Sequence, residues 1–410
     1  MAIPTKVQCA IAGGGPAGLM LGYLLARAGV NVLVLEKHAD FLRDFRGDTV
    51  HPSTLESMYE LGLIDRFLKL PHQKVEKLGG FVGDTPVTIA DFTRLPVHER
   101  FIALMPQWDF LNFLAEEGKR YPGFHLAMSA KATDLIEEGG RVVGLRAETQ
   151  EGPLEIRAEL VVGADGRGSI LRDKAGLESE DLGAPMDALW FRLPFKPGDA
   201  AETMGRFGAG YILALLYRGD YWQCAYVIPK GSLEKLKEGG FEAFQRAIAA
   251  AAPFPPDRVH DLKGWDDVKL LTVRVDRLTS WYRPGLLFIG DAAHAMSPIG
   301  GVGINLAIAD AIAAANILAK PLLAGRVRDR DLRAVQSRRN LATRVTQGIQ
   351  VAMQTNIIGP TLLTTAVPTP PWAVRMMQRF PVLQQIPARV FGLGVRRERV
   401  ADFIRSKGAG

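Results

Sequence analysis

The feature that most constrains the fold is a glycine-rich turn close to the start of the chain, Gly13-Gly14-Gly15-Pro16-Ala17-Gly18. An apolar run, 6–12, precedes the turn, and a leucine-rich segment with helical character, 19–25, follows it. A second apolar stretch, 30–35, ends at Glu36. A buried strand, a helix and a second buried strand form a βαβ unit, whose parallel sheet is covered on both faces. The pattern therefore predicts an α/β fold built on a parallel sheet.

Each glycine of the turn has its own physical role. Gly13 permits the tight turn, Gly15 lets the backbone approach a pyrophosphate, and Gly18 lets helix and strand pack closely. The helix start offers free N–H groups to phosphate, and the Glu36 carboxylate can accept hydrogen bonds from ribose hydroxyls. A Rossmann-like dinucleotide site is predicted, with a plain glycine-rich turn as the alternative and no choice yet between NAD and FAD. The candidate contacts here are Gly13, Gly15, Pro16, Ala17, Gly18, Glu36 and Lys37.

Two later stretches make that choice. Residues 160–169 read Leu-Val-Val-Gly-Ala-Asp-Gly-Arg-Gly-Ser, and residues 288–294 read Phe-Ile-Gly-Asp-Ala-Ala-His. Pro298 and a second glycine cluster, 300–303, follow. Alone, each stretch would pass for an ordinary turn or helix cap. With all three motifs in order over roughly residues 6–320, the sequence resembles the class A flavoprotein monooxygenases, the family typified by p-hydroxybenzoate hydroxylase.

The resemblance implies FAD as the bound cofactor. It implies that Asp291 accepts hydrogen bonds from the ribityl chain and that Asp165 serves both flavin and nicotinamide-coenzyme binding. Bare N–H groups at Gly300, Gly301 and Gly303, where a helix is expected to begin near 302, would face the flavin edge that becomes negative on reduction. The further residues assigned to FAD are Arg46, Gln107, Ala132, Asp165, Asp291, Pro298, Gly301, Gly303 and Ile304.

The resemblance also implies a reaction. NAD(P)H would reduce FAD, and O2 would form a C4a-hydroperoxyflavin that transfers one oxygen atom to a small-molecule substrate. The flavin carries this chemistry, so no catalytic side chain is assigned, although Pro298 and Arg46 are expected near the ring. An apolar aromatic or polycyclic substrate is expected, because the middle of the chain is rich in aromatic residues. The substrate candidates are His51, Tyr211, Tyr217, Trp222 and Tyr226, with a plain aromatic core as the alternative for the last four.

The order of segments predicts three regions. Further strands are expected at 141–148, 155–162 and 286–289, and a long helix follows at 302–318. Strands expected at 186–195, 211–217, 221–228 and 269–275 form an inserted antiparallel sheet. The predicted FAD-binding domain comprises residues 1–70, 101–180 and 270–325. Residues 71–100 and 181–269 form the predicted substrate-binding domain, and residues 326–410 a helical C-terminal segment.

Charge is concentrated in that last segment. Residues 326–410 contain 14 Arg and 1 Lys against 3 Asp and 1 Glu, a net charge of +11 in a chain of net charge +6. We expect the segment to fold onto the body and not to bind nucleic acid, because its apolar residues need a surface to cover. Those residues are Trp372, Met376, Met377, Phe380 and Phe391. A membrane patch is the alternative.

Composition excludes several other classes. The only two cysteines, Cys9 and Cys224, rule out a disulfide scaffold and a four-cysteine zinc site, and no metal site is expected. The apolar stretch 306–325 contains Asp310 and Lys320 and is expected to be a buried helix, so a cytoplasmic protein without a transmembrane segment is predicted. Two rivals stay open. One is a flavin-dependent reductase or epoxidase of an isoprenoid-type substrate, and the other is a non-catalytic flavin-binding redox protein.

Overall fold

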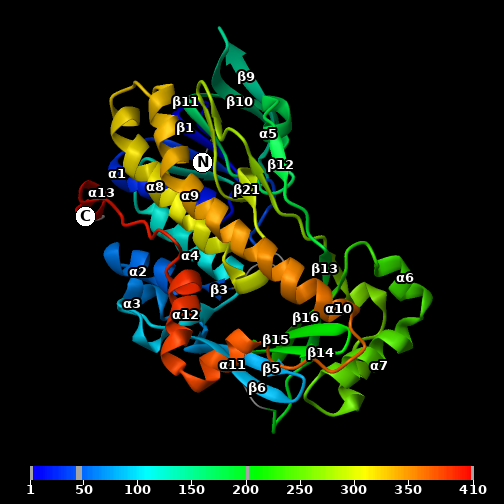
Figure 1. Cartoon of the computed structure of the whole chain (residues 1–410). Coiled ribbons are helices and arrows are strands. Elements are labelled where there is room, and N and C mark those ends of the chain that lie inside the picture. Colours follow the sequence, from blue (N-terminus) through cyan, green and yellow to red (C-terminus); the bar gives the residue numbers. More distant parts are fainter. Residues whose placement is uncertain (1–2, 43–48, 200–202, 408–410) are drawn as a thin grey trace.

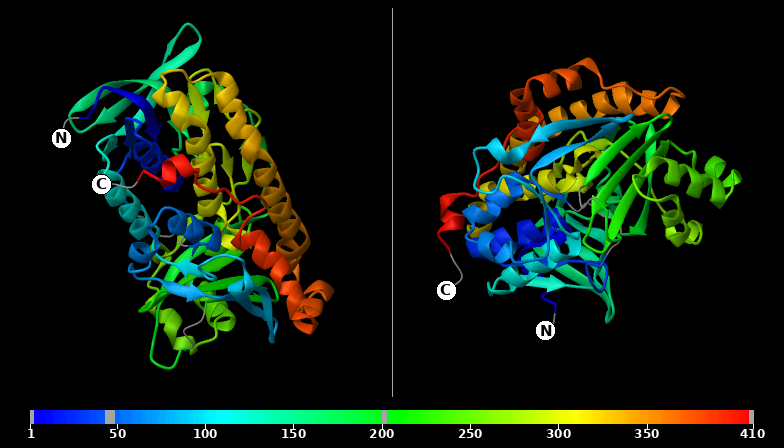
Figure 2. Two further views of the ribbon diagram at one scale, coloured as in Figure 1. Left: turned by 90° about the vertical axis from the view of Figure 1, so that its left-hand side faces the viewer. Right: turned by 90° about the horizontal axis from the view of Figure 1, so that it is seen from below.

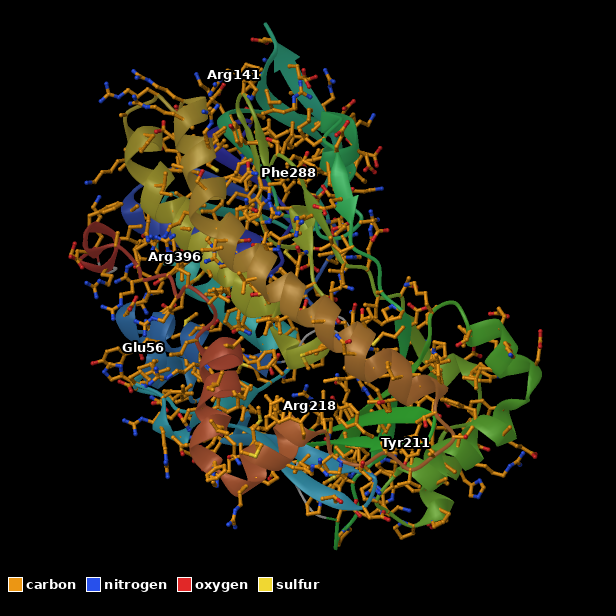
Figure 3. The ribbon with its side chains drawn as sticks, viewed as in Figure 1. Glu56, Arg141, Tyr211, Arg218, Phe288 and Arg396 are labelled. Carbon is orange, nitrogen blue, oxygen red and sulfur yellow. The ribbon has the colours of Figure 1, made fainter. Side chains whose placement is uncertain are left out.

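Two large β-sheets, joined by a layer of long helices, make up the fold (Figure 1). The computed structural model describes residues 3–42, 49–199 and 203–407. One sheet lies at each end of the molecule. Figure 3 shows Phe288 in the half with the largely parallel sheet and Tyr211 in the half with the antiparallel sheet. The mixed α/β class predicted from the sequence is confirmed.

The first sheet has eight strands in the order β19-β20-β11-β1-β2-β8, and β10 and β9 extend it beside β11. The strands from β20 to β8 run parallel to one another. Their bounds are β1 (Lys6–Ala12), β2 (Val32–Leu35), β8 (Phe124–Ala127), β9 (Lys131–Glu138), β10 (Arg141–Thr149), β11 (Gly152–Gly163), β19 (Tyr282–Arg283) and β20 (Leu286–Phe288).

The second sheet has seven strands in the order β17-β13-β16-β15-β14-β5-β6. All neighbours are antiparallel except β14 and β5. The bounds are β5 (Lys77–Val82), β6 (Thr85–Asp91), β13 (Met186–Pro194), β14 (Met204–Gly208), β15 (Tyr211–Tyr217), β16 (Tyr221–Pro229) and β17 (Lys269–Leu271). The strand expected at 269–275 is therefore only three residues long. The division into domains stays a prediction.

Two three-stranded sheets connect these parts. One comprises β12 (Ser179–Asp181), β18 (Asp276–Leu278) and β21 (His294–Ala295), and the other β3 (Thr49–Val50), β4 (Gln73–Val75) and β7 (Ile102–Leu104). The α-helices are α1 (Pro16–Ala28), α2 (Pro52–Glu60), α3 (Ile64–Phe67), α4 (Gln107–Lys119), α5 (Ile170–Ala175), α6 (Leu233–Glu238), α7 (Phe241–Ala251), α8 (Gly303–Leu323), α9 (Asp329–Met353), α10 (Gly359–Leu363), α11 (Trp372–Arg379), α12 (Gln385–Gly392) and α13 (Asp402–Arg405). A π-helix, Gln354–Ile358, continues α9.

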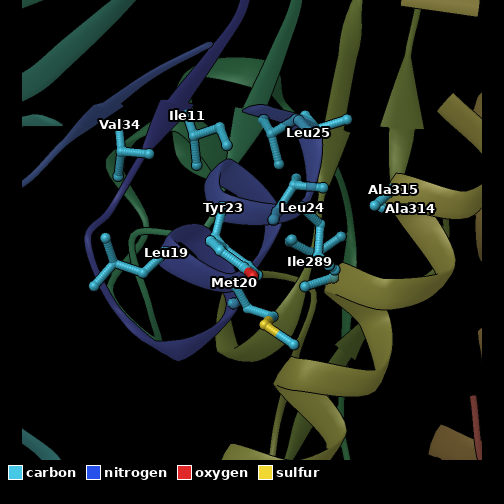
Figure 4. Close-up of a cluster of buried hydrophobic side chains, with 14 of the residues drawn as sticks. Ile11, Leu19, Met20, Tyr23, Leu24, Leu25, Val34, Ile289, Ala314 and Ala315 are labelled. Atoms are coloured by element: carbon cyan, nitrogen blue, oxygen red, sulfur yellow. The ribbon is translucent and has the colours of Figure 1, made fainter. Parts of the chain in front are cut away.

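The main core lies where α1 and α8 cover the parallel sheet. Apart from Pro16, every residue of α1 is buried, and Ala314 and Ala315 of α8 lie next to its leucines (Figure 4). Alanine is small enough to let two helix backbones approach closely. The helix α1 ends at Gly29, whose φ of 97° terminates it in the left-handed conformation.

Within the described ranges, one apolar helix is long enough to cross a membrane by length and composition, the stretch Ile299–Leu323. Of its most apolar window, 78% is buried inside the protein, and its residues belong to the main core. It is therefore the core helix α8, as the sequence predicted for this stretch.

The C-terminal segment folds onto the body, but not through the residues that we expected. Figure 2 shows it as an outer layer along one side of the molecule. Phe391 packs against Met296 and Val302. In contrast, Trp372 is 73% exposed and Phe380 is 49% exposed, so the expectation that they cover the body is wrong.

Candidate functional site

Three loops converge at the carboxyl edge of the parallel sheet. They follow β1, β11 and β20, which lie side by side. The carboxyl ends of parallel strands share one edge, where α/β sheets bind their ligands. The sheet order therefore brings the glycine-rich turn, the Asp165 loop and the Asp291 loop together, although they are far apart in the sequence.

The glycine-rich turn is shaped by its neighbours. Gly13 has a φ of +110°, and a Cβ there would lie 2.2 Å from the carbonyl oxygen of Ala164. A Cβ at Gly18 would lie 1.9 Å from the carbonyl oxygen of Gly13. A Cβ at Gly15 would meet nothing within 4 Å, and no side chain caps the helix α1 that begins after it. The first and third glycines are thus required by packing, whereas the second leaves open space at a bare helix start.

Glu36 is held at the mouth of this turn. Its Oε2 accepts a hydrogen bond from the Gly14 N–H at 3.0 Å, and its Oε1 accepts one from the His38 N–H at 3.0 Å. Lys37 beside it is exposed. Ala132 lies in β9, and the backbone contact to this corner comes from Ala130, whose N–H donates to the Glu36 carbonyl at 2.8 Å.

The second and third motifs contact each other. The Arg167 Nε donates to Asp291 Oδ2 at 3.0 Å, with both side chains about one-third exposed. Gly290 has a φ of +60°, and a Cβ there would lie 3.0 Å from the Cβ of Ala17. Each of the three motifs therefore touches another one.

Asp165 has an unsatisfied carboxylate oxygen. Burial raises the pKa of its carboxyl, although hydrogen bonds from Ser169 and the following amides oppose the shift. Oδ2 receives the Leu171 N–H at 3.5 Å, while Oδ1 has no partner in the part of the chain that the structure describes. A buried oxygen without a donor is costly, so it favours a ligand that brings one.

Residues 296–303 form a loop, which we call the cofactor loop, that runs through Pro298 and ends at the start of α8. Gly301 has a φ of +62°, and its N–H donates to the Pro298 carbonyl at 3.0 Å. The expectation that Gly301 leaves its N–H bare is therefore wrong, because the turn itself uses that donor. Gly303 begins α8 without a side-chain cap, and a Cβ there would meet nothing within 4 Å. Gly303 and Ile304 thus lie at the open end of the helix.

Asn305 links this loop to β3 and to the start of α2 through four hydrogen bonds. No local sequence pattern predicted this role. Its Oδ1 accepts from the His51 N–H at 2.9 Å and from the Thr54 hydroxyl at 2.7 Å. Its Nδ2 donates to the carbonyls of Thr49 and Gly301 at 3.3 and 3.4 Å. The amide, only 8% exposed, thus uses its full hydrogen-bonding capacity.

His51 is fully buried and lies next to Asn305. Its Nδ1 is 2.7 Å from the carbonyl oxygen of Phe391, so Nδ1 carries the proton and donates. Burial lowers the pKa of His51 to about 4, which keeps the ring neutral at pH 7. Its Nε2 has no partner among the described residues. The C-terminal segment therefore reaches the cofactor loop through Phe391.

A row of glutamines on α9 and the π-helix also holds the loop. Gln347 donates to the Ala295 carbonyl, Gln350 to the carbonyls of Ser297 and Ile299, and Gln354 to the Ser297 hydroxyl, at 2.9–3.1 Å. All three glutamines are buried. Their spacing of three and four residues on one helical face was the available sequence signal.

Two further residues were predicted to contact the cofactor, Gln107 and Arg46. Gln107 begins α4, as expected, and is partly exposed. Arg46 lies outside the described residues.

The aromatic residues proposed as a substrate wall lie on the far face of the antiparallel sheet. Tyr211, Tyr217, Trp222 and Tyr226 pack with Leu213 and with Phe244 of α7. Ile212, on the opposite face of β15, belongs to the cluster that contains Ile299 of the cofactor loop. The substrate assignment of these four residues is therefore wrong, because the strand register turns them toward α7.

The opposite face of the antiparallel sheet, on the side of the cofactor loop, carries a row of small residues. Ala225, Ala214, Gly205 and Gly80 lie opposite one another on four neighbouring strands, β16, β15, β14 and β5. Trp190 of β13 is opposite Ala225 and ends this row. Small side chains leave a flat strip between the bulkier residues of the same face.

Comparison with known proteins decides the family. Residues 6–348 match the FAD binding domain family. The chain belongs to this family, that of the class A flavoprotein monooxygenases. It is 33% identical over 386 residues to 6-methylpretetramide 4-monooxygenase of Streptomyces rimosus, covering 93% of this chain and 91% of that protein. It is 29% identical over 318 residues to rifampicin monooxygenase of Streptomyces venezuelae, but spans only 61% of it.

Solved structures show the same fold. The OxyS anhydrotetracycline hydroxylase of Streptomyces rimosus matches with a TM-score of 0.73 at 22% identity, over 96% of this chain and 77% of that one. The probable FAD-dependent monooxygenase pqsL of Pseudomonas aeruginosa matches with a TM-score of 0.73 at 20% identity, over 87% and 98%. The family match and the 33% identical relative, and not these structures, identify the chain as an FAD-dependent monooxygenase enzyme, as the sequence predicted.

The site of this flavoprotein monooxygenase fits its cofactor. Two uncapped helix starts, at Gly15 and Gly303, open onto space that a Cβ would not share with any protein atom. Oδ1 of Asp165 is a buried acceptor that a ligand hydroxyl can satisfy. Anionic phosphate favours a bare helix start, and so does an electron-rich ring edge.

Proposed function

We propose that this enzyme uses NAD(P)H and O2 to hydroxylate an apolar aromatic or polycyclic small molecule. The observation that carries the proposal is that Ile299, from the cofactor loop, packs against the buried cluster that contains Ile212 on the near face of the antiparallel sheet. That packing puts the cofactor loop on the same side of the antiparallel sheet as the strip of small residues. A flat ring system fits such a strip better than a bulky one.

The chain's own residues bind and orient the cofactor in this proposal. Amides at Gly15 and the start of α1 bind the pyrophosphate, together with Pro16, Ala17 and Gly18 around them. Glu36 accepts from the ribose hydroxyls. Asp291 and Asp165 accept from the ribityl chain and the neighbouring ring. Lys37, Arg46, Gln107 and Ala132 complete the proposed contacts.

The start of α8 supplies the electrostatics. When bound, FAD accepts a hydride from NAD(P)H and activates O2 for transfer of one oxygen atom. The amides of Gly303 and Ile304 stabilise negative charge on the ring edge. Pro298, whose φ is fixed by its ring, sets the path of the loop that faces the substrate.

The protein also fixes this loop. Asn305, Gln350 and Gln354 bind its backbone or its Ser297 hydroxyl, so the amides keep their direction when charge develops.

We place the reaction in the cytoplasm, because both cysteines are free and buried, as suits a reducing compartment.

The test is turnover of the purified enzyme. We expect a yellow protein that releases one FAD per chain on acid denaturation, since no covalent attachment motif is present. NAD(P)H oxidation and O2 uptake should rise together when a polycyclic phenol is added from a panel. Turnover of a substrate without O2 uptake would support a reductase instead. Bound flavin without any turnover would support a non-catalytic flavin-binding redox protein.

A further inference from the structure

The helix α11 exposes large apolar side chains to solvent. A helix on a protein surface normally buries such residues against the body of the protein. Trp372, Met376 and Phe380 recur every four residues and so share one side of the helix. They are 73%, 38% and 49% exposed. No residue of α11 is buried.

Two glutamines hold the same segment on β6, and the partly buried residues of α11 are Ala373, Val374 and Met377. Gln378 donates to the Thr88 carbonyl of β6 at 2.7 Å and accepts from the Thr88 N–H at 3.1 Å. Gln385 donates to the Asp91 carbonyl at 2.8 Å. The segment is thus held on the sheet by these hydrogen bonds and by the apolar packing of Ala388, while Trp372, Met376 and Phe380 stay exposed.

Apolar exposure of this kind is concentrated in one part of the chain. Nine of the fifteen large hydrophobic residues exposed in the described chain lie between 357 and 395. They are Ile357, Leu363, Val367, Trp372, Met376, Phe380, Val382, Ile386 and Val395. In the view from below, this orange and red stretch forms one outer layer of the molecule (Figure 2).

The charge of this layer has one sign. Residues 357–395 contain Arg375, Arg379 and Arg389 and no Asp or Glu. All three arginines are exposed. Arg375 and Arg379 lie one position before Met376 and Phe380, so they flank the apolar stripe.

We propose that this surface docks the enzyme on an anionic phospholipid bilayer. We call it the α11 face and define it as Trp372, Arg375, Met376, Arg379, Phe380, Val382 and Ile386. An interfacial helix buries tryptophan and other large apolar residues at the boundary of headgroups and acyl chains, while its arginines bind lipid phosphates. The α11 face supplies both groups of side chains on one outer surface.

Charge complementarity decides for the bilayer against a second copy of the chain. In a two-fold dimer through this face, arginines would oppose arginines, with no acidic residue from the same stretch to compensate. Nucleic acid would match the charge but would leave the exposed tryptophan, phenylalanine and valine in water.

The experiment is co-sedimentation of the FAD-loaded full chain with vesicles. One set contains phosphatidylglycerol and phosphatidylcholine, and the other contains phosphatidylcholine alone. We expect binding to the anionic vesicles that weakens with added salt. The pair R375Q/R379Q should reduce binding about fivefold per arginine at low ionic strength. The pair W372S/F380S should remove most of it, because the apolar contact is lost.

Matched controls keep the test independent of folding and activity. L270S changes an exposed apolar residue on β17, and R246Q/R330Q removes two exposed arginines elsewhere; both should bind as the unchanged chain does. Flavin content should be the same in every variant. The proposal would be overturned if the unchanged chain did not bind anionic vesicles, or if W372S/F380S bound them as strongly as the unchanged chain. A dimer in solution that W372S dissociates would also overturn it and assign the face to a second copy.

Discussion

The guanidinium of Arg167 and the carboxylate of Asp291 form an ion pair at 3.0 Å that joins the second and third sequence motifs. Arg167 also donates to the Met296 carbonyl at 3.4 Å, so it spans the carboxyl edge of the sheet. We expect Arg167→Met to lower FAD affinity because Asp291 loses the group that orients it. The dissociation constant for FAD, measured by flavin fluorescence, checks this. Arg66→Met, at a partly exposed ion pair on α3, should leave that constant unchanged.

Glu36→Ala removes a carboxylate that two backbone amides hold in place. If it accepts from the ribose, its loss costs a pair of charge-assisted hydrogen bonds, about 10- to 100-fold in FAD affinity. Titration of the flavin-free protein with FAD measures the change. Glu116→Ala, an exposed carboxylate on α4, serves as the control. An unchanged constant for Glu36→Ala would reject the role of this residue.

Gly303→Val adds a side chain where a Cβ meets no protein atom within 4 Å. The variant should fold normally, yet either lose FAD or consume NAD(P)H with release of hydrogen peroxide, because the added side chain displaces the ring. FAD content, peroxide and hydroxylated product are measured together. Gly301→Val should instead destabilise the protein itself, since its Cβ would lie 2.4 Å from the Thr49 hydroxyl and its φ is positive. Full FAD content and normal product formation in Gly303→Val would show that this loop does not position the flavin.

His51 should make stability depend on pH. Its pKa is lowered to about 4 in the folded protein, from an ordinary value of about 6.5, so only the unfolded chain binds the proton between these values. Stability is therefore complete above pH 6.5 and is lost as the pH falls toward 4. Between pH 7 and 5 the loss is about 2 kcal/mol. The free energy of unfolding of His51→Gln, measured in urea at several pH values, should lack this pH dependence. The same change between pH 7 and 5 in both proteins would contradict the lowered pKa of His51.

Arg339→Met should be strongly destabilising. The Arg339 guanidinium lies between the buried carboxylates of Asp310 and Glu398, at 2.9 and 3.3 Å. His294 and Arg339 together lower the pKa of Asp310 in spite of its burial, so the carboxylate stays charged and needs its cation. Removing the cation costs about 3–5 kcal/mol. Arg338→Met, which loses only a partly exposed contact to Glu398, should cost about 1 kcal/mol or less in the same unfolding experiment.

Local patterns in the sequence predicted the parallel sheet, the three motif loops and the start of α8. Each depends on a short run in which glycine, proline and apolar residues already specify the backbone. The contacts of Asn305 and Gln350 could not be predicted in this way, because their partners are backbone carbonyls in another segment. The aromatic residues of β15 and β16 were assigned to the wrong face, because strand alternation alone does not tell which face a helix covers. His51 and Phe391, 340 residues apart, meet only in the folded chain.

The glutamine row on α9 and the contact from Phe391 have a consequence for the order in which the enzyme is made. The glycine-rich turn leaves the ribosome among the first residues, but the loop at Pro298 gains its hydrogen-bonding partners only after residue 354 and its contact with Phe391 later still. We therefore expect flavin to be captured only after the C-terminal segment has been synthesised. A chain truncated before Phe391 should lose the flavin, and it would also lose Val400 and Ile404 from the core of the parallel-sheet half.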